Sequence, residues 1–242
     1  MALQISVIIP TLNEKRTIMA TVAQTATLGF EELIVVDGGS TDTTPALVES
    51  YRLRTQTSAL SPVRLMTAPR GRANQMNEGA KASDGDVLLF LHADTQLPSD
   101  AKATIESALS DQRIIGGWFD VRFDRPSIWG TIISSMMNWR SKLSGIATGD
   151  QALFVRRPTF ERMGGFADLP LMEDIDFSRR LKQQGATAAL PATVTTSFRR
   201  WEQQGPLRTI LLMWTLRFLY WMGTNPHRLA HLYKTVRETT RD

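Results

Sequence analysis

Short apolar runs alternate with segments of helical spacing between residues 5 and 91. Each run is four or five residues long, and each intervening segment is longer than ten residues. The runs are residues 5–9, 33–36, 63–66 and 87–91, and the intervening segments are residues 11–28, 44–54 and 72–82. Apolar runs of this length are typical of strands buried on both faces, and their alternation with helices is typical of parallel sheets. The sequence therefore predicts an α/β fold with a mostly parallel central sheet flanked by helices.

Polar residues follow three of these runs at the point where each run ends. Residues 10–14 follow the first run, residues 37–42 follow the second, and residues 92–94 follow the fourth. Because the carboxyl ends of parallel strands meet at one edge of a sheet, where α/β folds bind their ligands, we expect the three clusters to line one crevice. Each cluster alone also suits an ordinary turn or a helix start. Three clusters at strand ends together favour a binding site.

Charge is distributed unevenly along the 242 residues. From Arg199 onward the chain has eight Lys or Arg against three Asp or Glu, whereas the preceding part has twenty against twenty-one. A tail that is both basic and apolar favours a membrane surface or an anionic ligand over a nucleic acid. The absence of cysteine excludes disulfides and thiolate metal sites. Together with an N-terminus that lacks a signal-peptide pattern, it predicts a cytoplasmic protein.

The second half of the chain has a less regular pattern. Its expected strands are residues 117–123 and 152–155, and its expected helices are residues 128–139, 177–184, 206–222 and 226–237. No composition shift resembles a linker between domains. We therefore expect one domain over residues 1–205, followed by an apolar and basic helical extension over residues 206–242.

Residues 210–222 form an apolar stretch that Arg217 interrupts. A transmembrane helix needs about twenty apolar residues, so we do not expect this stretch to span a bilayer. Its aromatic residues and neighbouring arginines suit a helix that lies in the interface at the inner face of the membrane. The alternative is that this stretch packs on the domain itself or on a second copy of the chain in a homodimer.

Five segments of the chain match a known pattern when they are taken together. They are residues 6–14, 35–42, 77–79, 92–94 and 173–176, which read SVIIPTLNE, VVDGGSTD, NEG, HAD and EDID. In this order and spacing they resemble the inverting family 2 glycosyltransferases of the GT-A fold, and the resemblance covers roughly residues 5–185. It implies the transfer of a sugar from a nucleotide-diphosphate donor to an acceptor hydroxyl, with Mn²⁺ or Mg²⁺ as cofactor.

The resemblance assigns donor contacts to the strand ends and to the start of the third predicted helix. A carboxylate at Asp37 would accept hydrogen bonds from a base N–H or from ribose hydroxyls, and Gly39 would let the backbone approach the ligand. Arg70 and Arg72 would contact the nucleotide or its diphosphate, or else are solvated loop residues. The implied donor-binding residues are Pro10, Thr11, Asn13, Glu14, Asp37, Gly39, Arg70, Arg72, Asn77, His92, Ala93 and Asp94.

The metal motif of the family is Asp-x-Asp, and this chain departs from it because His92 occupies the first position. The retained carboxylate, Asp94, is the implied metal ligand. Mg²⁺ and Mn²⁺ take oxygen ligands and receive much of their shell from water and phosphates, so one carboxylate can suffice. An imidazole at His92 would favour Mn²⁺ if it bound the metal. Our expectation is that His92 contacts the donor without binding metal.

Asp174 is the general base that the resemblance implies. An inverting transfer needs a carboxylate that removes the proton of the acceptor hydroxyl as its oxygen attacks the anomeric carbon. The alternative for the acids of residues 173–176 is an interaction with the dipole at the start of a helix. On the acceptor and diphosphate side, the candidate residues are Asp150, Glu173, Arg200 and Trp201.

The form of these motifs narrows the family further. A His-Ala-Asp segment, an Arg-Arg-Trp element and a short apolar tail are similar to a small bacterial subgroup associated with arsenosugar biosynthesis. A sugar-phosphate nucleotidyltransferase is one alternative, but such enzymes share a glycine-rich loop after the first strand, and residues 11–16 contain no glycine. A non-catalytic module that binds a membrane surface is the other. Whether the acceptor is a small molecule or is lipid-linked does not follow from the sequence.

Overall fold

The computed structural model describes the backbone of residues 3–238 and their side chains, except those of residues 200, 203, 204 and 234–238. The strands are β1 (Ile5–Thr11), β2 (Glu32–Asp37), β3 (Val63–Thr67), β4 (Val87–Phe90), β5 (Thr95–Gln96), β6 (Ile114–Phe123), β7 (Leu153–Arg156) and β8 (Ala186–Thr196). The helices are α1 (Ile18–Ala26), α2 (Thr44–Thr55), α3 (Arg72–Lys81), α4 (Ala101–Leu109), α5 (Ile128–Ser144), the 3₁₀ turn η1 (Gly149–Gln151), α6 (Arg157–Arg162), α7 (Glu173–Gln184), α8 (Arg199–Gln204), α9 (Pro206–Trp221) and α10 (Pro226–Glu238).

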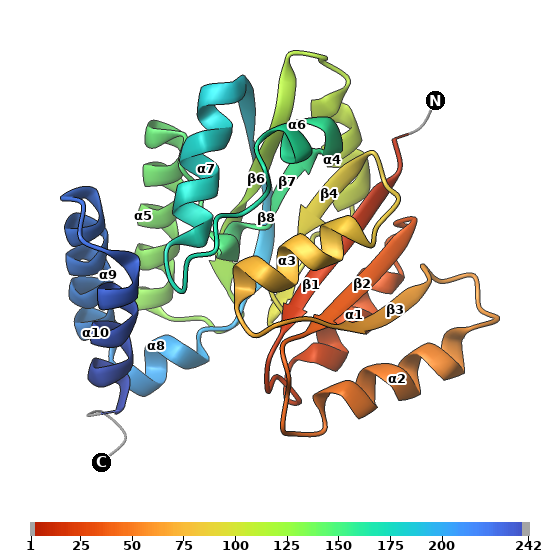
Figure 1. Ribbon diagram of the computed structural model, residues 1–242, viewed down its shortest axis with the longest axis horizontal. Coiled ribbons are helices and arrows are strands. Elements are labelled where there is room, and N and C mark those ends of the chain that lie inside the picture. Colours follow the sequence, from red (N-terminus) through yellow and green to blue (C-terminus); the bar gives the residue numbers. More distant parts are fainter. Residues whose placement is uncertain (1–2, 239–242) are drawn as a thin grey trace.

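These strands form one sheet in the order β3-β2-β1-β4-β7-β6-β8-β5. The pairs among β1 to β4 are parallel, and so is the pair of β6 with β8. Strand β7 runs antiparallel to both of its neighbours, and the short β5 runs antiparallel to β8. Helices cover both faces of the sheet (Figure 1). The predicted α/β architecture with a mostly parallel sheet is confirmed.

Burial on both faces explains the apolar runs of the sequence. Along β1, Val7 and Ile9 belong to the core on one face of the sheet, and Ile8 between them belongs to the core on the other face. Every residue of β1, β2 and β4 is buried. A strand in this position has no solvated face, so its sequence is continuously apolar instead of alternating.

Helix α3 packs directly on β1 and β2. It presents Gly79 to these strands, and a Cβ at that position would stand 2.9 Å from Val36 Cγ2 and would overlap Ile8. Glycine is therefore the residue that permits so close an approach. Because α3 begins at Arg72, this packing also fixes one side of the candidate site.

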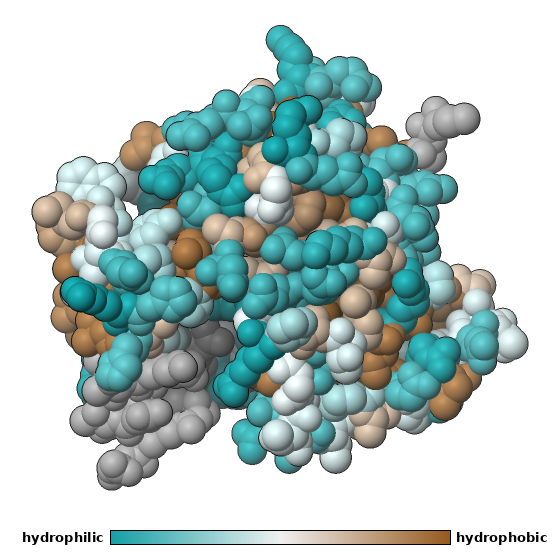
Figure 2. Space-filling model, in the orientation of Figure 1, coloured by the Kyte–Doolittle hydropathy of each residue, from teal (hydrophilic) through white to brown (hydrophobic). Residues whose placement is uncertain are grey.

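Helices α9 and α10 pack on the body of the protein and lie beside α5 (Figure 1). Leu216 and Leu229 are buried in a cluster with Leu171 and Met172, which precede α7. The opposite side of this region is exposed, and hydrophobic residues gather at the left edge of Figure 2, where Figure 1 places α9. None of the helices within residues 3–238 combines the length and the hydropathy that crossing a bilayer requires.

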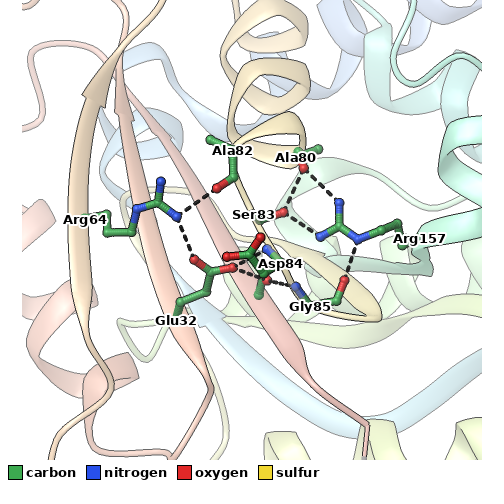
Figure 3. A network of polar contacts seen from close by, with 9 residues as sticks. Glu32, Arg64, Ala80, Ala82, Ser83, Asp84, Gly85 and Arg157 are labelled. Carbon is green, nitrogen blue, oxygen red and sulfur yellow. Dashed lines mark hydrogen bonds and ion pairs between the residues drawn. The ribbon is translucent and has the colours of Figure 1, made fainter.

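A polar network ties the amino ends of the strands to the end of α3 (Figure 3). Glu32 accepts hydrogen bonds from Ser6 Oγ and Asp84 N, both at 2.7 Å, and pairs with Arg64 at 3.1 Å. The Arg157 guanidinium donates to three acceptors between α3 and β4, namely Ala80 O (3.0 Å), Ser83 Oγ (2.9 Å) and Gly85 O (2.6 Å). Carbonyls left unpaired by the end of a helix are thereby satisfied at the edge opposite the candidate site.

Three predicted helix boundaries differ from the observed ones by more than two residues. The segment expected to be helical from residue 11 begins with the last residue of β1 and is then a loop until Ile18, with Asn13 at a φ of +56° that no helix permits. The helix expected over residues 177–184 begins earlier, at Glu173, so the acidic residues lie in its first turn. The helix expected over residues 128–139 continues to Ser144.

Six elements are absent from the sequence-based prediction: the strands β5 and β8, the helices α4, α6 and α8, and the 3₁₀ turn η1. Strand β8 is rich in alanine and threonine, contains Pro191 and is mostly only partly buried. It therefore lacks the apolar signal of β1 or β4. Strand β8 is ordered by its pairing with β6, from Ile114↔Ala186 to Phe123↔Thr196, and its own sequence does not indicate a strand.

Candidate active site

The loops that follow β1 and β2 are joined by hydrogen bonds. Asn13 Oδ1 accepts from Thr41 N at 2.8 Å, and Asn13 N donates to Ser40 Oγ at 2.9 Å. The Asp37 carboxylate accepts from Gly39 N at 3.0 Å and from Ser40 N at 2.8 Å. The ends of the two strands therefore meet at one edge of the sheet, as their parallel pairing requires.

Gln75 of α3 also belongs to this edge, although no motif in the sequence reveals it. Its Nε2 donates to Thr11 O and to Val36 O, both at 2.8 Å, and so bridges β1 and β2. The Thr11 hydroxyl is buried and has no hydrogen-bond partner within the part of the chain that the structure describes. An unsatisfied buried hydroxyl costs free energy, so a ligand that bonded it would be favoured.

His92 lies between an acidic and a basic side chain. Its Nδ1 is 3.1 Å from Asp150 Oδ1, and its Nε2 is 3.5 Å from Arg72 Nη1. An arginine N–H can only donate, so in the neutral imidazole Nε2 accepts and Nδ1–H donates to Asp150. Both ring nitrogens thus face protein partners, an arrangement that leaves no lone pair directed at a metal ion.

The topology explains why His92 and Asp150 meet. The antiparallel pairing of β4 with β7 sets Phe90 beside Leu153, so the turn before β7 lies next to the end of β4. Gly149 in that turn is required, because a Cβ there would stand 2.7 Å from His92 Cε1 and would overlap Nε2. The turn therefore holds the imidazole in place from one side.

The buried Glu173 forms an ion pair with the more exposed Arg72, with Oε1 and Nε 3.0 Å apart. The Glu173 side chain is 3% exposed, and its burial raises the pKa of Glu173 while the Arg72 cation opposes that rise. The carboxylate in turn raises the pKa of Arg72, which keeps the guanidinium charged. Glu173 thus orients Arg72 toward His92 and also lines the cavity described below.

Asp174 is held by two backbone N–H groups. Its Oδ2 accepts from Gly149 N at 2.8 Å, and its Oδ1 accepts from Ile175 N at 2.7 Å. The residue lies in the first turn of α7 and lines a cavity, where its carboxylate is half-buried. A carboxylate fixed in this way can accept a proton from a group that enters the cavity.

Residues with strained backbone conformations lie in the segments that form the candidate site. Among residues 3–238, the non-glycine residues with positive φ are Asn13 (+56°), Ala152 (+48°) and Met172 (+69°). Met172 directly precedes Glu173, and Ala152 directly follows the turn that contacts His92. Such conformations each cost of order 1–3 kcal/mol and tend to occur where function requires a fixed geometry.

Asp94 differs from Asp37, Asp150, Glu173 and Asp174 because its carboxylate has no partner among the described residues. It follows β4, is half-buried, and forms no hydrogen bond or ion pair with the residues that the structure describes. No cluster of three or more histidine or acidic side chains converges on a metal position within residues 3–238. A single available carboxylate nevertheless fits Mg²⁺ or Mn²⁺, which take their remaining ligands from phosphates and water.

A cavity of about 400 Å³ adjoins Arg72, His92, Asp150, Glu173 and Asp174. Its other walls are mostly apolar and come from α5, α9 and the segment that leads into α7, which the sequence did not connect with the site. These walls are formed by Ile133, Met136, Met137, Trp139, Arg140, Thr148, Leu171, Met172, Ile175, Trp201, Thr209, Ile210, Met213, Trp214, Arg217 and Tyr233.

Two residues predicted to bind the donor have contacts within the protein. The Asn77 amide exchanges hydrogen bonds with the backbone of Phe166 in both directions, at 2.8 and 2.9 Å. Asn77 therefore fastens α3 to the segment before α7. Glu14 forms an ion pair with Arg199 at 3.3 Å and so joins the first loop to α8.

The remaining candidates lie around the edge of the site. Pro10 and Ala93 are buried at the ends of β1 and β4, and Arg70 is exposed before α3. Trp201 lines the cavity and packs against Phe123, with ring centroids 6.0 Å apart. The side chain of Arg200 lies outside the described residues.

Sequence comparison identifies a family. The model of the family described as "Glycosyl transferase family 2" matches residues 6–164, which is more than half of the chain. "Probable glycosyltransferase YdaM" of Bacillus subtilis is 26% identical over 219 residues, which is 83% of this chain and 51% of that protein. "Beta-monoglucosyldiacylglycerol synthase" of Synechocystis is 24% identical over 254 residues, 92% of this chain and 51% of that protein. The chain thus spans about half the length of these relatives.

Comparison with solved structures shows the same fold. The mannosyltransferase PcManGT of Pyrobaculum calidifontis, in complex with GDP-Man and Mn²⁺, gives a TM-score of 0.65 at 22% identity over 98% of this chain and 65% of that chain. TarS 1-349 of S. aureus gives a TM-score of 0.60 at 18% identity over 90% of this chain and 66% of that chain. The chain therefore has the GT-A fold, and identities this low show the fold alone.

Proposed function

The chain belongs to glycosyltransferase family 2, and we propose that it transfers a sugar from a nucleotide-diphosphate donor to an acceptor hydroxyl with inversion at the anomeric carbon. The observation that carries this proposal is the carboxylate of Asp174, which two backbone N–H groups orient at the wall of a cavity beside Arg72 and His92. The structures of related fold that contain GDP-Man or UDP-GlcNAc support a nucleotide sugar as the donor.

The donor nucleotide binds in this proposal at the ends of β1 and β2. Asp37 is buried there, and the backbone of Gly39 approaches it in a tight turn. The Thr11 hydroxyl supplies a buried polar group whose hydrogen-bonding capacity is free among the described residues. Arg72 then contacts the diphosphate, because it stands between this edge and the cavity and stays charged beside Glu173.

Asp94 is the residue that would hold the divalent cation, together with the donor phosphates. A bound Mn²⁺ or Mg²⁺ would neutralise the charge that develops on the leaving diphosphate. His92 contributes from a different position, because its Nδ1–H and Nε2 are directed at Asp150 and Arg72. It orients the arginine and the turn that carries Asp150.

Proton transfer is the task of Asp174. The acceptor hydroxyl enters the cavity, its oxygen forms a bond to the anomeric carbon, and its proton moves to the Asp174 carboxylate. The bond from that carbon to the diphosphate breaks, and the diphosphate leaves with the electron pair. Arg72 stabilises the negative charge on the departing group. The Gly149 N–H keeps the carboxylate in position throughout.

A screen of donors tests this proposal. We expect one nucleotide diphospho-sugar from a panel of UDP, GDP and dTDP sugars to raise the melting temperature of the protein by several degrees, and to do so more strongly with Mn²⁺ than with EDTA, because a ligand that binds only the folded state stabilises it. The matching nucleoside monophosphates are the control. Absence of stabilisation by every donor in the panel would contradict the proposal.

We further propose that the protein binds a membrane surface through α5 and α9. On α9, Leu207, Leu211, Trp214, Phe218 and Trp221 recur at intervals of three or four residues, and each is between 56% and 79% exposed. This spacing places them on one face of the helix. Helix α5 carries a similar exposed stripe: Ile128, Ile132, Met136, Trp139 and Leu143.

The charges of these helices indicate which surface they fit. Helix α5 contains Arg140 and Lys142, helix α9 contains Arg208 and Arg217, and neither helix contains Asp or Glu. An apolar face with aromatic residues and only cationic charge is typical of helices that lie in the interface of an anionic bilayer. A second copy of the chain would bring like charges together, which disfavours a homodimer through this face.

Vesicle binding tests this surface. We expect the protein to co-sediment with vesicles that contain phosphatidylglycerol and less with pure phosphatidylcholine. The double variant Leu211→Ser/Phe218→Ser should bind at least tenfold less, because burial of one such side chain is worth roughly 1.5–3 kcal/mol. Leu53→Ser on α2, which is 57% exposed, is the matched control. A dimer in solution with no vesicle binding would contradict the membrane proposal.

A further inference from the structure

Two arginines in the cavity wall have no ion-pair partner among the residues that the structure describes. Arg140 of α5 and Arg217 of α9 both line the 400 Å³ cavity, and the Nε of each is buried without a hydrogen-bond partner within the described part of the chain. Neither forms an ion pair with a described residue, and the guanidinium of Arg140 has only a weak 3.3 Å contact with Ser141. Burial lowers the pKa of Arg140, a sign that its charge is poorly compensated.

Arg140 and Arg217 are half-buried, and a guanidinium Nε–H that is buried without a hydrogen-bond partner is costly unless a ligand completes the site. The carboxylates that act on Arg140 electrostatically are Asp174 and Asp150, and neither lies within ion-pair distance of it. Two guanidinium groups on facing helices repel each other, whereas an anion bound by both would be held by charge-assisted hydrogen bonds. The arrangement therefore favours an anionic ligand between α5 and α9.

The surroundings of the arginines separate this ligand from the donor. Asn13, Asp37 and Ser40, in the loops proposed to bind the nucleotide, do not line the cavity. Apolar residues such as Ile133, Met136 and Met213 do line it. The diphosphate and the sugar of a donor have no hydrocarbon part that such walls would contact. The arginines and the apolar walls thus recognise two parts of one amphiphilic molecule on the acceptor side of Asp174.

We propose that the acceptor is an amphiphile with a phosphate group, that Arg140 and Arg217 bind this phosphate, and that its hydrocarbon part lies between α5 and α9. A second cavity of about 620 Å³ shares Arg140, Ile175 and Arg217 with the first, so the space around the arginines extends toward Trp221 and the surface. The exposed apolar stripes of α5 and α9 continue this path outside the cavity. The inference rests on the proposed transferase function and names its substrate class.

Binding of a simple probe tests the inference without requiring turnover. Decyl phosphate below its micelle concentration, decanol and inorganic phosphate would be titrated separately into the full chain by calorimetry. We expect decyl phosphate to bind at least tenfold more tightly than either of the other two. Arg140→Gln and Arg217→Gln should each weaken it by about tenfold or more, as expected for loss of a charged hydrogen bond. The matched control is Arg208→Gln, because Arg208 is an exposed arginine of α9, the helix that also contains Arg217.

Each outcome of these titrations decides the question. If decanol bound as tightly as decyl phosphate, the arginines would not recognise an anion. If inorganic phosphate bound as tightly as decyl phosphate, the cavity would not recognise a hydrocarbon part of the ligand. Loss of donor nucleotide affinity in Arg140→Gln and Arg217→Gln, with decyl phosphate binding unchanged, would assign the arginines to the leaving diphosphate. Arg140→Lys, which keeps the charge, should retain part of the affinity, and retained far-ultraviolet circular dichroism would establish that the variants fold.

The separate titrations keep two failures apart. If no nucleotide sugar stabilises the protein, the proposed function fails whatever the alkyl phosphate does. If a nucleotide sugar binds but decyl phosphate does not, only the acceptor inference fails.

Discussion

The substitution Asp174→Asn is expected to slow glycosyl transfer by about two to four orders of magnitude, because general base catalysis typically contributes ~10²–10⁴-fold. The amide is nearly isosteric with the carboxylate and keeps one oxygen that can accept the hydrogen bond from Gly149 N. It cannot take the proton of the acceptor hydroxyl. Single-turnover rates with a saturating donor would measure the effect, and calorimetry should show donor affinity within about threefold of the wild type.

Asp168→Asn is a matched control for this variant. Asp168 is an exposed acid in the segment that leads into α7, so its amide should leave both rate and donor affinity unchanged. If Asp174→Asn lost donor affinity to the same extent as rate, Asp174 would be a structural residue that holds the turn at Gly149. Full activity in Asp174→Asn would remove it from the mechanism altogether.

The part of the fold that the sequence predicts is the part whose order comes from local burial. Strands β1, β2 and β4 are mostly apolar because both of their faces are covered. Strand β8 has no such pattern, since its alanines and threonines are ordered by pairing with β6 across a long stretch of chain. Context of this kind decides strand formation more than the residues themselves do.

Some contacts of the candidate site likewise follow from the sequence pattern, and others depend on how the elements pack. The meeting of the loops after β1 and β2 follows from parallel pairing, which the alternating pattern predicts. The contact of His92 with Asp150 depends instead on β7 running antiparallel beside β4, and nothing in residues 152–155 reveals that direction. The pairing of Arg72 with Glu173 depends on how α3 and α7 pack, which is a property of the assembled core.

The sequence pattern does not predict the cavity walls on the proposed acceptor side, which come from α5 and α9. The apolar residues of α5 recur with helical spacing, and such a stripe ordinarily indicates a face turned toward the core. In the structure, part of this stripe is exposed, including Trp139 and Leu143, while Arg140 turns into the cavity. Only the position of α9 beside α5 shows that an arginine from each helix lines the same cavity.

Asp94→Asn is expected to lower the rate of transfer by about two to three orders of magnitude and to remove most of the stimulation by Mn²⁺. A metal ion supplies several kcal/mol of charge stabilisation to the departing diphosphate, and each 1.36 kcal/mol corresponds to a tenfold change in rate. Asp94 has no partner among the described residues, so the loss of its charge should leave the fold intact. Electron paramagnetic resonance of Mn²⁺ with the nucleotide present would measure binding independently of turnover.

The variant His92→Gln tests whether Asp94 is the metal ligand, because the two variants should differ in their affinity for Mn²⁺. If Asp94 alone holds the cation, His92→Gln should slow the reaction through the loss of its contacts with Asp150 and Arg72 while Mn²⁺ affinity stays within about threefold of the wild type. Asp100→Asn, an exposed acid beyond β5, should change neither quantity. A loss of Mn²⁺ affinity in His92→Gln as large as that in Asp94→Asn would make the imidazole a ligand. Undiminished turnover of the wild type in EDTA would instead remove the metal from the mechanism, and Asp94 would then need another role in binding the donor.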